Sequence, residues 1–186
     1  MGQDLPVTSF ALLGLFTFGE GDRPQKLTGY ELKRRADATL RFYWVSPAMS
    51  QVYKELSRLA ERGLVSPSDD DRGTTYSITS AGRSALEAWM RESEPGFSVL
   101  KHPIALRLLL GHLVEPSATI AMLHDHLEAL DKEREALVEV RESLRGADAP
   151  GETFRHPSLV ADWGLEYFAH ERLIVEDLIR RINQDE

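Results

Sequence analysis

Residues 46–79, SPAMSQVYKELSRLAERGLVSPSDDDRGTTYSIT, constrain the fold of this chain most strongly. Ser46 followed by Pro47 predicts a helix start, because proline at the first helical position loses no N–H donor that the helix needs. The apolar positions that follow have helical spacing: Val52, Leu56 and Leu59. Gly63 is a typical helix end, since glycine readily takes the left-handed conformation of a C-terminal cap. The first part of the segment is therefore predicted to be an amphipathic helix.

A β-hairpin is predicted directly after this helix. Residues 64–66 are a short strand, residues 69–73 a turn, and residues 74–78 a second strand with β-branched and aromatic side chains. A polar-faced helix followed at once by a hairpin is typical of a winged helix-turn-helix, whose recognition helix enters the DNA major groove. The alternative is a helix and hairpin at the corner of an ordinary α+β domain, and this segment alone does not separate the two.

The candidate DNA contacts lie on the polar face of this helix and in the predicted helix before it. The polar face offers hydroxyl, amide and cationic groups: Ser50, Gln51, Lys54, Ser57 and Arg58. In the preceding helix, Thr28 and Glu31 form a capping box that marks its start. The basic triplet Lys33, Arg34 and Arg35 follows, and it is either a surface that contacts phosphates or a solvated face.

The charge distribution is compatible with DNA binding, although the net charge is -8. Residues 1–98 hold 12 Lys and Arg against 13 Asp and Glu, whereas residues 99–186 hold 10 against 17. Between residues 28 and 63 there are seven cations and four anions. A local basic surface decides DNA binding, not the total charge. The acidic residues are concentrated in the other half of the chain.

The composition argues against secretion, membrane insertion and catalysis. The chain has no cysteine, which excludes disulfides and is compatible with a reducing compartment. The apolar run of residues 10–18 is far shorter than the roughly 20 residues of a membrane helix, and no basic residue precedes it as in a signal peptide. We therefore expect a cytoplasmic protein without a membrane partner. Nucleophile, phosphate-loop and zinc-protease motifs are absent from the sequence, so we expect no enzyme, no catalytic residue and no cofactor.

Three motifs occur together in one order and spacing: GYEL, QVYKEL.RL...GLV and YSIT.AGR. With their surroundings, they closely resemble the PadR family of bacterial transcriptional regulators. The runs FALLGLFTFG and HPIALRLLLGHL also resemble that family's first and fifth helices, so the resemblance covers about residues 10–113 and, more loosely, the helical remainder. It implies a winged helix, a helical dimerisation region and DNA binding in the cytoplasm, often relieved by a small effector. Tyr53 matches an aromatic position of the family, where it either packs at the edge of the core or contacts a phosphate.

The chain departs from the family pattern in two places. The loop of residues 19–27 is longer than the usual turn before GYEL, and the wing turn reads DDDRG where relatives tend to be basic. Three carboxylates beside one arginine repel phosphates, so we expect the recognition helix to carry most of the binding. Arg72 and Thr74 are the wing residues expected to assist.

The second half is predicted to mediate self-association. A helix over residues 117–145 carries leucines at coiled-coil spacing, with Arg134 as a polar break, and a last helix over residues 158–183 is apolar on two sides. One side can pack on its own chain and the other on a partner subunit. The candidate dimerisation residues are Leu123, Leu127, Leu130, Leu137, Trp163, Ile174, Leu178 and Ile182.

The aromatic and metal-ligating residues leave alternatives open. The aromatics Trp163, Tyr167, Phe168 and Trp89 either line an effector pocket or pack in the core. His124 and His126 are two apart on a helix and so point in different directions. Asp162, Glu166 and His170 share a helix face, and we interpret them as interfacial hydrogen-bonding groups, so no metal site is expected.

These observations predict a mainly α-helical protein with a small β-hairpin. Residues 1–95 are expected to form a winged helix-turn-helix domain and residues 96–186 a long-helix dimerisation domain that also offers an effector site. The predicted function is that of a homodimeric transcriptional repressor. Its expected partners are double-stranded DNA with an inverted-repeat operator, a second copy of itself and a small aromatic effector. The alternative is a winged-helix docking module for another protein, without specific DNA binding.

Overall fold

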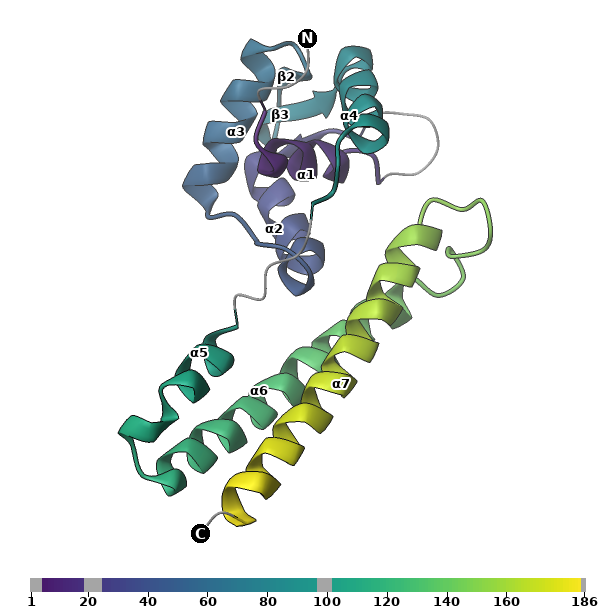
Figure 1. Ribbon diagram of the computed structural model, residues 1–186. Coiled ribbons are helices and arrows are strands. Elements are labelled where there is room, and N and C mark those ends of the chain that lie inside the picture. The colour runs from purple at the N-terminus through teal and green to yellow at the C-terminus, as the bar shows by residue number, and fades with distance from the viewer. Residues whose placement is uncertain (1–4, 19–24, 97–101, 185–186) are drawn as a thin grey trace. The chain divides into compact units, whose positions relative to one another are not determined.

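The computed structural model describes residues 5–18, 25–96 and 102–184, and it divides into two compact units, Met1–Gly96 and Phe97–Glu186 (Figure 1). Helices predominate and a small antiparallel sheet lies in the first unit, so the predicted fold class is confirmed. Residues 19–24 of the long loop noted in the sequence lie outside the described residues.

The first unit is a winged helix-turn-helix. Its elements are α1 (Val7–Leu15), β1 (Leu27–Thr28), α2 (Gly29–Thr39), the 3-10 turn η1 (Leu40–Phe42), α3 (Met49–Glu61), β2 (Val65–Asp70), β3 (Gly73–Ile78) and α4 (Ser80–Glu92). The capping box that starts α2 is present, because the Thr28 hydroxyl accepts from the Glu31 amide and the Glu31 carboxylate accepts from the Thr28 amide. Helix α3 is the predicted recognition helix.

The core of this unit collects the apolar stripes of its helices. The fully buried side chains include Leu12, Leu13, Phe16, Leu32, Ala36, Val52, Leu56 and Leu59. Helix α1 is apolar nearly all round and therefore lies inside, packed against α2, α3 and α4. The helical spacing of Val52, Leu56 and Leu59 thus turns one side of α3 inward and leaves its opposite side to solvent.

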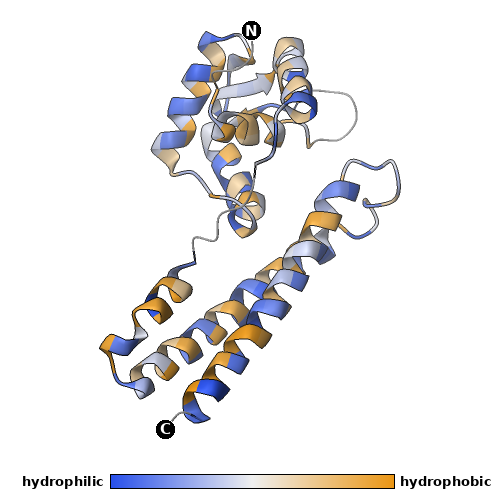
Figure 2. Cartoon of the chain, in the orientation of Figure 1, coloured by the Kyte–Doolittle hydropathy of each residue, from blue (hydrophilic) through white to orange (hydrophobic). Residues whose placement is uncertain are grey.

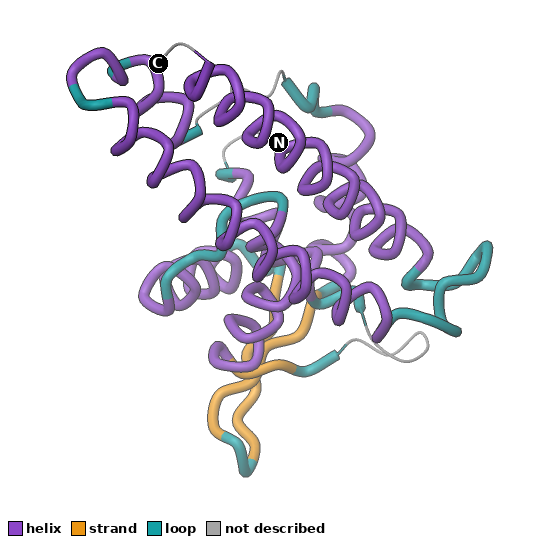
Figure 3. Tube along the Cα trace, turned by 90° about the horizontal axis from the view of Figure 1, so that it is seen from below, coloured by secondary structure: helices purple, strands orange, loops and turns teal. Residues whose placement is uncertain are grey.

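The sheet has three strands in the order β1-β3-β2, with both pairs antiparallel. The strands are the orange segments of Figure 3. The predicted five-residue turn is wrong, because β2 continues to Asp70, and Asp70 pairs with Gly73 across a two-residue turn. Gly73 has φ +96°, a left-handed conformation that suits glycine and lets the strands close tightly. Strand β1 was not predicted, and two residues are too few for a sequence pattern.

Helix α3 begins later than the Ser46–Pro47 signal indicates. Ala48 is its N-cap residue, and Pro47 is buried ahead of the helix. The Ser46 hydroxyl donates to the Asp37 carboxylate of α2 instead of capping α3. A tertiary contact therefore overrides the local start signal. The end of the helix follows the prediction, since Gly63 has φ +67°.

The second unit consists of helices α5 (Pro103–Leu109), α6 (Pro116–Ser143) and α7 (Arg155–Gln184), with the 3-10 turn η2 (Gly111–Leu113) between α5 and α6. Helices α6 and α7 lie side by side along their length (Figures 1 and 3). Apolar residues alternate with polar ones along these helices (Figure 2). Leu123, Leu127, Leu130 and Val175 form the buried centre of this unit. Among the described residues, no helix is both long and apolar enough to cross a membrane.

Candidate nucleic-acid interface

Helix α3 presents an exposed polar face. The candidate contact residues with exposed side chains on it are Ser50, Gln51, Tyr53, Lys54 and Ser57. The opposite side of the helix holds Val52, Leu56 and Leu59, each fully buried. This face therefore offers donors, acceptors and one cation to a ligand, without a continuous apolar patch.

Arg58 is held within the protein. Its Nη1 donates to the two carboxylate oxygens of Glu55 at 2.8 and 2.9 Å. Glu55 is buried and also accepts a hydrogen bond from the Ser9 hydroxyl of α1. Because a buried carboxylate needs a positive partner, Arg58 serves the junction of α1 and α3. A phosphate contact by Arg58 would have to compete with this pair.

The basic triplet of α2 is divided between three environments. Lys33 pairs with Asp37 one turn later, and this hydrogen bond, with a second from Ser46, lowers the pKa of Asp37. Arg35 donates to the backbone carbonyls of Leu15 and Phe18 at 2.9 and 2.8 Å, and so binds the end of α1. Arg34 has an exposed side chain. Of the three, Arg34 has the surroundings expected of a phosphate ligand.

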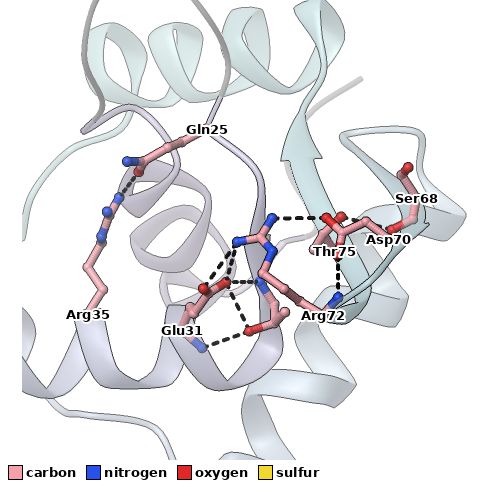
Figure 4. A network of polar contacts seen from close by, with 8 residues as sticks. Gln25, Glu31, Arg35, Ser68, Asp70, Arg72 and Thr75 are labelled. Atoms are coloured by element: carbon pink, nitrogen blue, oxygen red, sulfur yellow. Dashed lines mark hydrogen bonds and ion pairs between the residues drawn. The ribbon is translucent and has the colours of Figure 1, made fainter.

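Arg72 connects the tip of the wing to the start of α2 (Figure 4). Its Nη2 donates to Asp70 at 2.9 Å and its Nη1 to Glu31 at 3.2 Å. Hydrogen bonds from the Thr28 amide and hydroxyl lower the pKa of Glu31, and Arg72 lowers it further. The same carboxylate therefore caps α2 and binds the wing. The guanidinium charge of Arg72 is compensated within the protein, which weakens its case as a phosphate ligand.

An open pocket of about 590 Å³ lies where the wing meets α2 and α3. Its lining residues come from all three elements: Thr28, Tyr30, Glu31, Arg34, Tyr53, Arg72, Thr74 and Tyr76. Thr74 also donates to Asp69 at 2.8 Å. The Tyr53 ring packs so closely over Gly29 that a Cβ there would stand 2.6 Å from its Cε1. Both alternatives considered for Tyr53 are thus compatible with its position, because its ring packs while its side chain remains half exposed.

Two pocket residues, Tyr30 and Tyr76, were not among the candidate DNA contacts. Glu31 was expected to cap α2 but not to contact the wing. Tyr30 is 62% exposed at the second position of α2, where its spacing from Leu32 and Ala36 places it off the buried stripe. That spacing was a usable signal. Nothing local connects Glu31 with Arg72, which is 41 residues away in the chain.

The candidate dimerisation residues of the second unit fall into two groups. Leu123, Leu127, Leu130 and Leu137 are buried inside their own chain, so they pack helices of one chain together and are not free for a partner. Trp163 is 72% and Ile174 55% exposed. Leu178 and Ile182 are partly buried against the unit's own core. Further exposed apolar side chains of this unit, not among the candidate dimerisation residues, include Leu106, Leu109, Leu110, Leu113, Val114, Leu159 and Leu173.

The candidate effector residues are not one cluster of core side chains. Trp89 belongs to the first unit, where it stacks on Phe10 with ring centroids 5.0 Å apart. On α7, Phe168 packs against the core and contacts Tyr167 edge-on, with centroids 6.1 Å apart. Burial and the negative charge of Glu171 raise the pKa of Tyr167. Trp163 and Tyr167 remain available to a ligand or a partner chain.

The face shared by Asp162, Glu166 and His170 is occupied by other contacts. Asp162 accepts from Arg141 Nε at 2.7 Å. His170 Nδ1 lies 2.8 Å from the Glu166 backbone oxygen. These residues make contacts within their own chain. A different group, formed by His102, His126 and Glu171, brings three ligand atoms within 4.8 Å of one another.

These elements define the fold as a winged helix-turn-helix unit followed by a unit of long helices. Solved structures of PadR-like transcriptional regulators share it over nearly their full length. Bacillus subtilis PadR in complex with operator DNA matches with a TM-score of 0.79 and 21% identity, covering 95% of this chain and 99% of that one. The same protein in complex with p-coumaric acid matches with a TM-score of 0.76 and 21% identity, covering 96% and 99%.

A PadR-like transcriptional regulator from Bacillus cereus matches with a TM-score of 0.77 and 18% identity, covering 96% of this chain and 99% of that one. No protein-family model matches the sequence, and no curated protein sequence does. The fold expected from the sequence motifs is therefore confirmed: the chain has the fold of the PadR-like regulators.

Proposed function

We propose that this chain is a PadR-family transcriptional regulator that binds double-stranded DNA as a homodimer in the cytoplasm. The observation that carries the proposal is the exposed polar face of α3, with Ser50, Gln51, Lys54 and Ser57 set on a winged-helix scaffold. Such a face inserts into the major groove in helix-turn-helix proteins. B. subtilis PadR, which shares the fold, has been solved with operator DNA.

The exposed side chains divide this surface into two kinds of contact. Gln51 and Ser50 lie in the first turn of α3, the part of a recognition helix that reaches base edges, so they are the proposed sequence-reading residues. Lys54 and Arg34 are the proposed phosphate ligands, and Arg34 shares its pocket with Tyr53 and Thr74. Lys33, Arg58 and Arg72 have partners inside the protein and contribute mainly by holding the surface in place.

Selection of bound duplexes from a random DNA pool tests this proposal directly. A homodimer with two-fold symmetry places its recognition helices roughly 34 Å apart, so the selected sites are expected to be inverted repeats. Lys54→Ala should weaken binding to the selected duplex and reduce the slope of log K against log salt by about one unit per lost phosphate contact. Lys132→Ala removes the same charge from α6 and is the matched control, expected to bind as the parent does.

A docking module for another protein is the competing class. The two classes differ in what α3 presents, since a protein partner needs a central apolar surface whereas DNA needs donors and cations. The α3 face favours DNA. If no duplex is enriched over the random pool and Lys54→Ala leaves salt dependence unchanged, the docking function replaces the regulator.

The regulator is proposed to act as a repressor, because a dimer seated on a promoter most simply blocks polymerase, and to release DNA when a small aromatic acid binds. B. subtilis PadR in complex with p-coumaric acid supports such a ligand class. The exposed aromatic side chains of Trp163 and Tyr167 support a location of the effector site on α7. A ligand acts only through different affinities for two arrangements of the protein.

Tryptophan fluorescence tests the effector. Trp44 and Trp89 belong to the first unit and Trp163 to the second, so Trp163→Phe assigns the signal to one unit or the other. Phenolic acids such as p-coumarate are the probes. Quenching that is lost in Trp163→Phe, together with release of the selected duplex, supports an effector site on α7. Quenching without release of the duplex contradicts effector control.

A further inference from the structure

His102, His126 and Glu171 form a compact group at the meeting point of three helices in the second unit. His102 is the N-cap residue of α5, His126 lies on α6 and Glu171 on α7. The Oε1 atom of Glu171 is 2.9 Å from His102 Nε2 and 3.3 Å from His126 Nε2. The two imidazole rings are perpendicular, with centroids 5.4 Å apart. We call these three residues the His–His–Glu cluster.

The cluster is largely shielded from solvent. The side chains of His102, His126 and Glu171 are 17%, 18% and 13% exposed. Their chain neighbours Ile104, Leu127 and Phe168 pack in the apolar core of the unit. An apolar border limits competition by water and fixes the rotamers of the ligating groups, as in protein metal sites. Exposed surface carboxylates lack both properties.

Two imidazoles and one carboxylate suit a divalent transition metal. Zn²⁺ binds His nitrogen at about 2.0–2.1 Å and carboxylate oxygen at about 2.0–2.2 Å in tetrahedral geometry. Those bond lengths place neighbouring ligand atoms roughly 3.3 Å apart. The cluster holds its three ligand atoms within 4.8 Å of one another, with its two nitrogen-to-oxygen distances at 2.9 and 3.3 Å. Small side-chain rotations therefore accommodate an ion, and the fourth position is left for water.

Metal binding has one identifiable local cost. His102 Nδ1 accepts from the Ala105 amide at 3.4 Å, which places the ring proton on Nε2. Coordination through Nε2 moves the proton to Nδ1 and ends this long hydrogen bond. Ala105 is exposed, so water can satisfy its freed amide. The loss of one weak cap bond is small beside the three metal–ligand bonds that form.

We propose that the His–His–Glu cluster is a binding site for a divalent transition metal of the Zn²⁺ class, ligated by His102 Nε2, His126 Nε2 and a Glu171 carboxylate oxygen. The ion joins α5, α6 and α7 at one point. His102 is the residue at which α5 starts. Metal occupancy thus fixes where α5 begins against the two long helices, independently of any DNA contact.

The experiment uses the full chain after EDTA treatment and dialysis. Calorimetric titration with ZnCl₂ should give one ion per chain, and the transition temperature should rise with Zn²⁺ because the ion binds only the folded state. His126→Gln and Glu171→Gln keep helix-forming side chains of similar size. His102→Asn removes the ligand but keeps a good N-cap residue. Each is expected to raise the Kd at least about tenfold and to abolish most of the rise in transition temperature.

Neighbouring residues supply matched controls. His124→Gln and Glu166→Gln change the same residue types on the same helices at exposed positions, and they should bind Zn²⁺ as the parent does. Visible absorption by bound Co²⁺ gives a second reading that does not depend on stability. The proposal is overturned if the parent takes up no Zn²⁺ at micromolar concentration, or if the controls lose affinity as much as the cluster variants. Neither outcome bears on DNA binding.

Discussion

Lys54 and Arg58 lie one turn apart on α3, but Lys54 is exposed whereas Arg58 is only partly exposed. Arg58 neutralises Glu55, whose side chain is 5% exposed, so its removal leaves a buried carboxylate without its cationic partner. We expect Arg58→Ala to lower the free energy of unfolding by about 1–3 kcal/mol. Because the Arg58 side chain is itself 32% exposed, the cost should stay below the roughly 3–5 kcal/mol of fully buried pairs.

Urea denaturation measures this difference. Lys54→Ala is the control and should change the stability by no more than about 0.5 kcal/mol. Adding Glu55→Gln to Arg58→Ala removes the buried charge and should recover part of the loss. Equal stability of Arg58→Ala and the parent would show that Arg58 is free to leave Glu55. Arg58 would then again be a candidate phosphate ligand.

Glu31 provides a prediction about pH. Hydrogen bonds from Thr28 and the charge of Arg72 depress its pKa below the ordinary value of 4.5, so the folded state prefers the carboxylate. A depressed pKa contributes stability that is complete above 4.5 and is lost as the pH falls through the lower, folded value. The ion pair between Arg72 of the wing and Glu31 of α2 should therefore be intact at pH 4.5. It should weaken as the pH falls through the folded pKa of Glu31.

Carbon-detected NMR titration of the Glu31 carboxyl measures this pKa. Arg72→Ala should raise the midpoint only part of the way toward 4.5, since the Thr28 amide, the largest cause of the shift, remains. Arg83→Ala on α4 removes an equal charge and should leave the midpoint unchanged. A full return to 4.5 in Arg72→Ala would mean that the wing, and not the capping box, controls this carboxylate.

At the scale of elements, α4 packs closely against the residue before β2 because its contact residue there, Gly82, has no side chain. Gly82 lies in the first turn of α4, and a Cβ there would stand 2.1 Å from the Leu64 backbone oxygen. Alanine usually stabilises a helix by about 1 kcal/mol over glycine, but a backbone atom cannot move aside cheaply. Gly82→Ala should therefore destabilise the first unit by about 1–3 kcal/mol net.

Gly14 of α1 is the matched control. A Cβ there meets nothing within 4 Å, so Gly14→Ala should stabilise the protein by up to about 1 kcal/mol. Thermal unfolding of the two variants gives opposite signs if packing, and not helix propensity, decides at Gly82. A higher transition temperature for Gly82→Ala would show that α4 can move away from Leu64.

Local sequence patterns predicted the helices and strands well, but they predicted the contacts between these elements poorly. The Thr28–Glu31 capping box, the Gly63 helix end and the stripe of Val52, Leu56 and Leu59 are short-range features, and each is present. The two-residue wing turn was missed because three aspartates read as turn residues, whereas pairing with β3 keeps Asp69 and Asp70 extended and leaves only Asp71 in the turn. Tertiary context overrode local propensity there.

The sequence predicted which helix carries the candidate site, but it did not predict which residues its charged side chains pair with. The polar face of α3 follows from helical period alone. The commitment of Arg58 to Glu55 depends on the burial of Glu55 beneath α1, and the group of His126 with Glu171 joins residues 45 apart in the chain. Pairings at such separations come from the packing of whole helices, which no local window contains. Long-range polar contacts were therefore beyond the sequence pattern.

At the scale of the whole molecule, the two units divide charge and apolar surface between them. The first unit is nearly neutral and exposes the polar face of α3, and the second carries most of the excess of acidic residues. Several large apolar side chains of the second unit are nevertheless exposed, among them Leu109 at 74% and Leu113 at 70%. Exposed apolar residues on an acidic, long-helix unit are expected where a second chain covers them.

The proposed homodimer is best tested on these exposed residues. Deleting α7 would uncover Leu123, Leu127 and Leu130, which are buried in the unit's own core, and would confuse unfolding with dissociation. The double variant Leu109→Asp with Trp163→Asp changes only side chains that already face solvent in one chain. We expect it to remain helical and to sediment as a monomer where the parent is a dimer.

DNA binding by this double variant distinguishes the contribution of each subunit from the contribution of dimerisation. A monomer engages each half of an inverted repeat independently, so affinity for the full repeat should fall to that for a single half-site, while affinity for one half-site is unchanged. Met90→Asp introduces one such negative charge at an exposed apolar position of α4, in the other unit, and should stay dimeric. If the double variant still sediments as a dimer and still prefers the repeat, the subunits meet through residues other than Leu109 and Trp163.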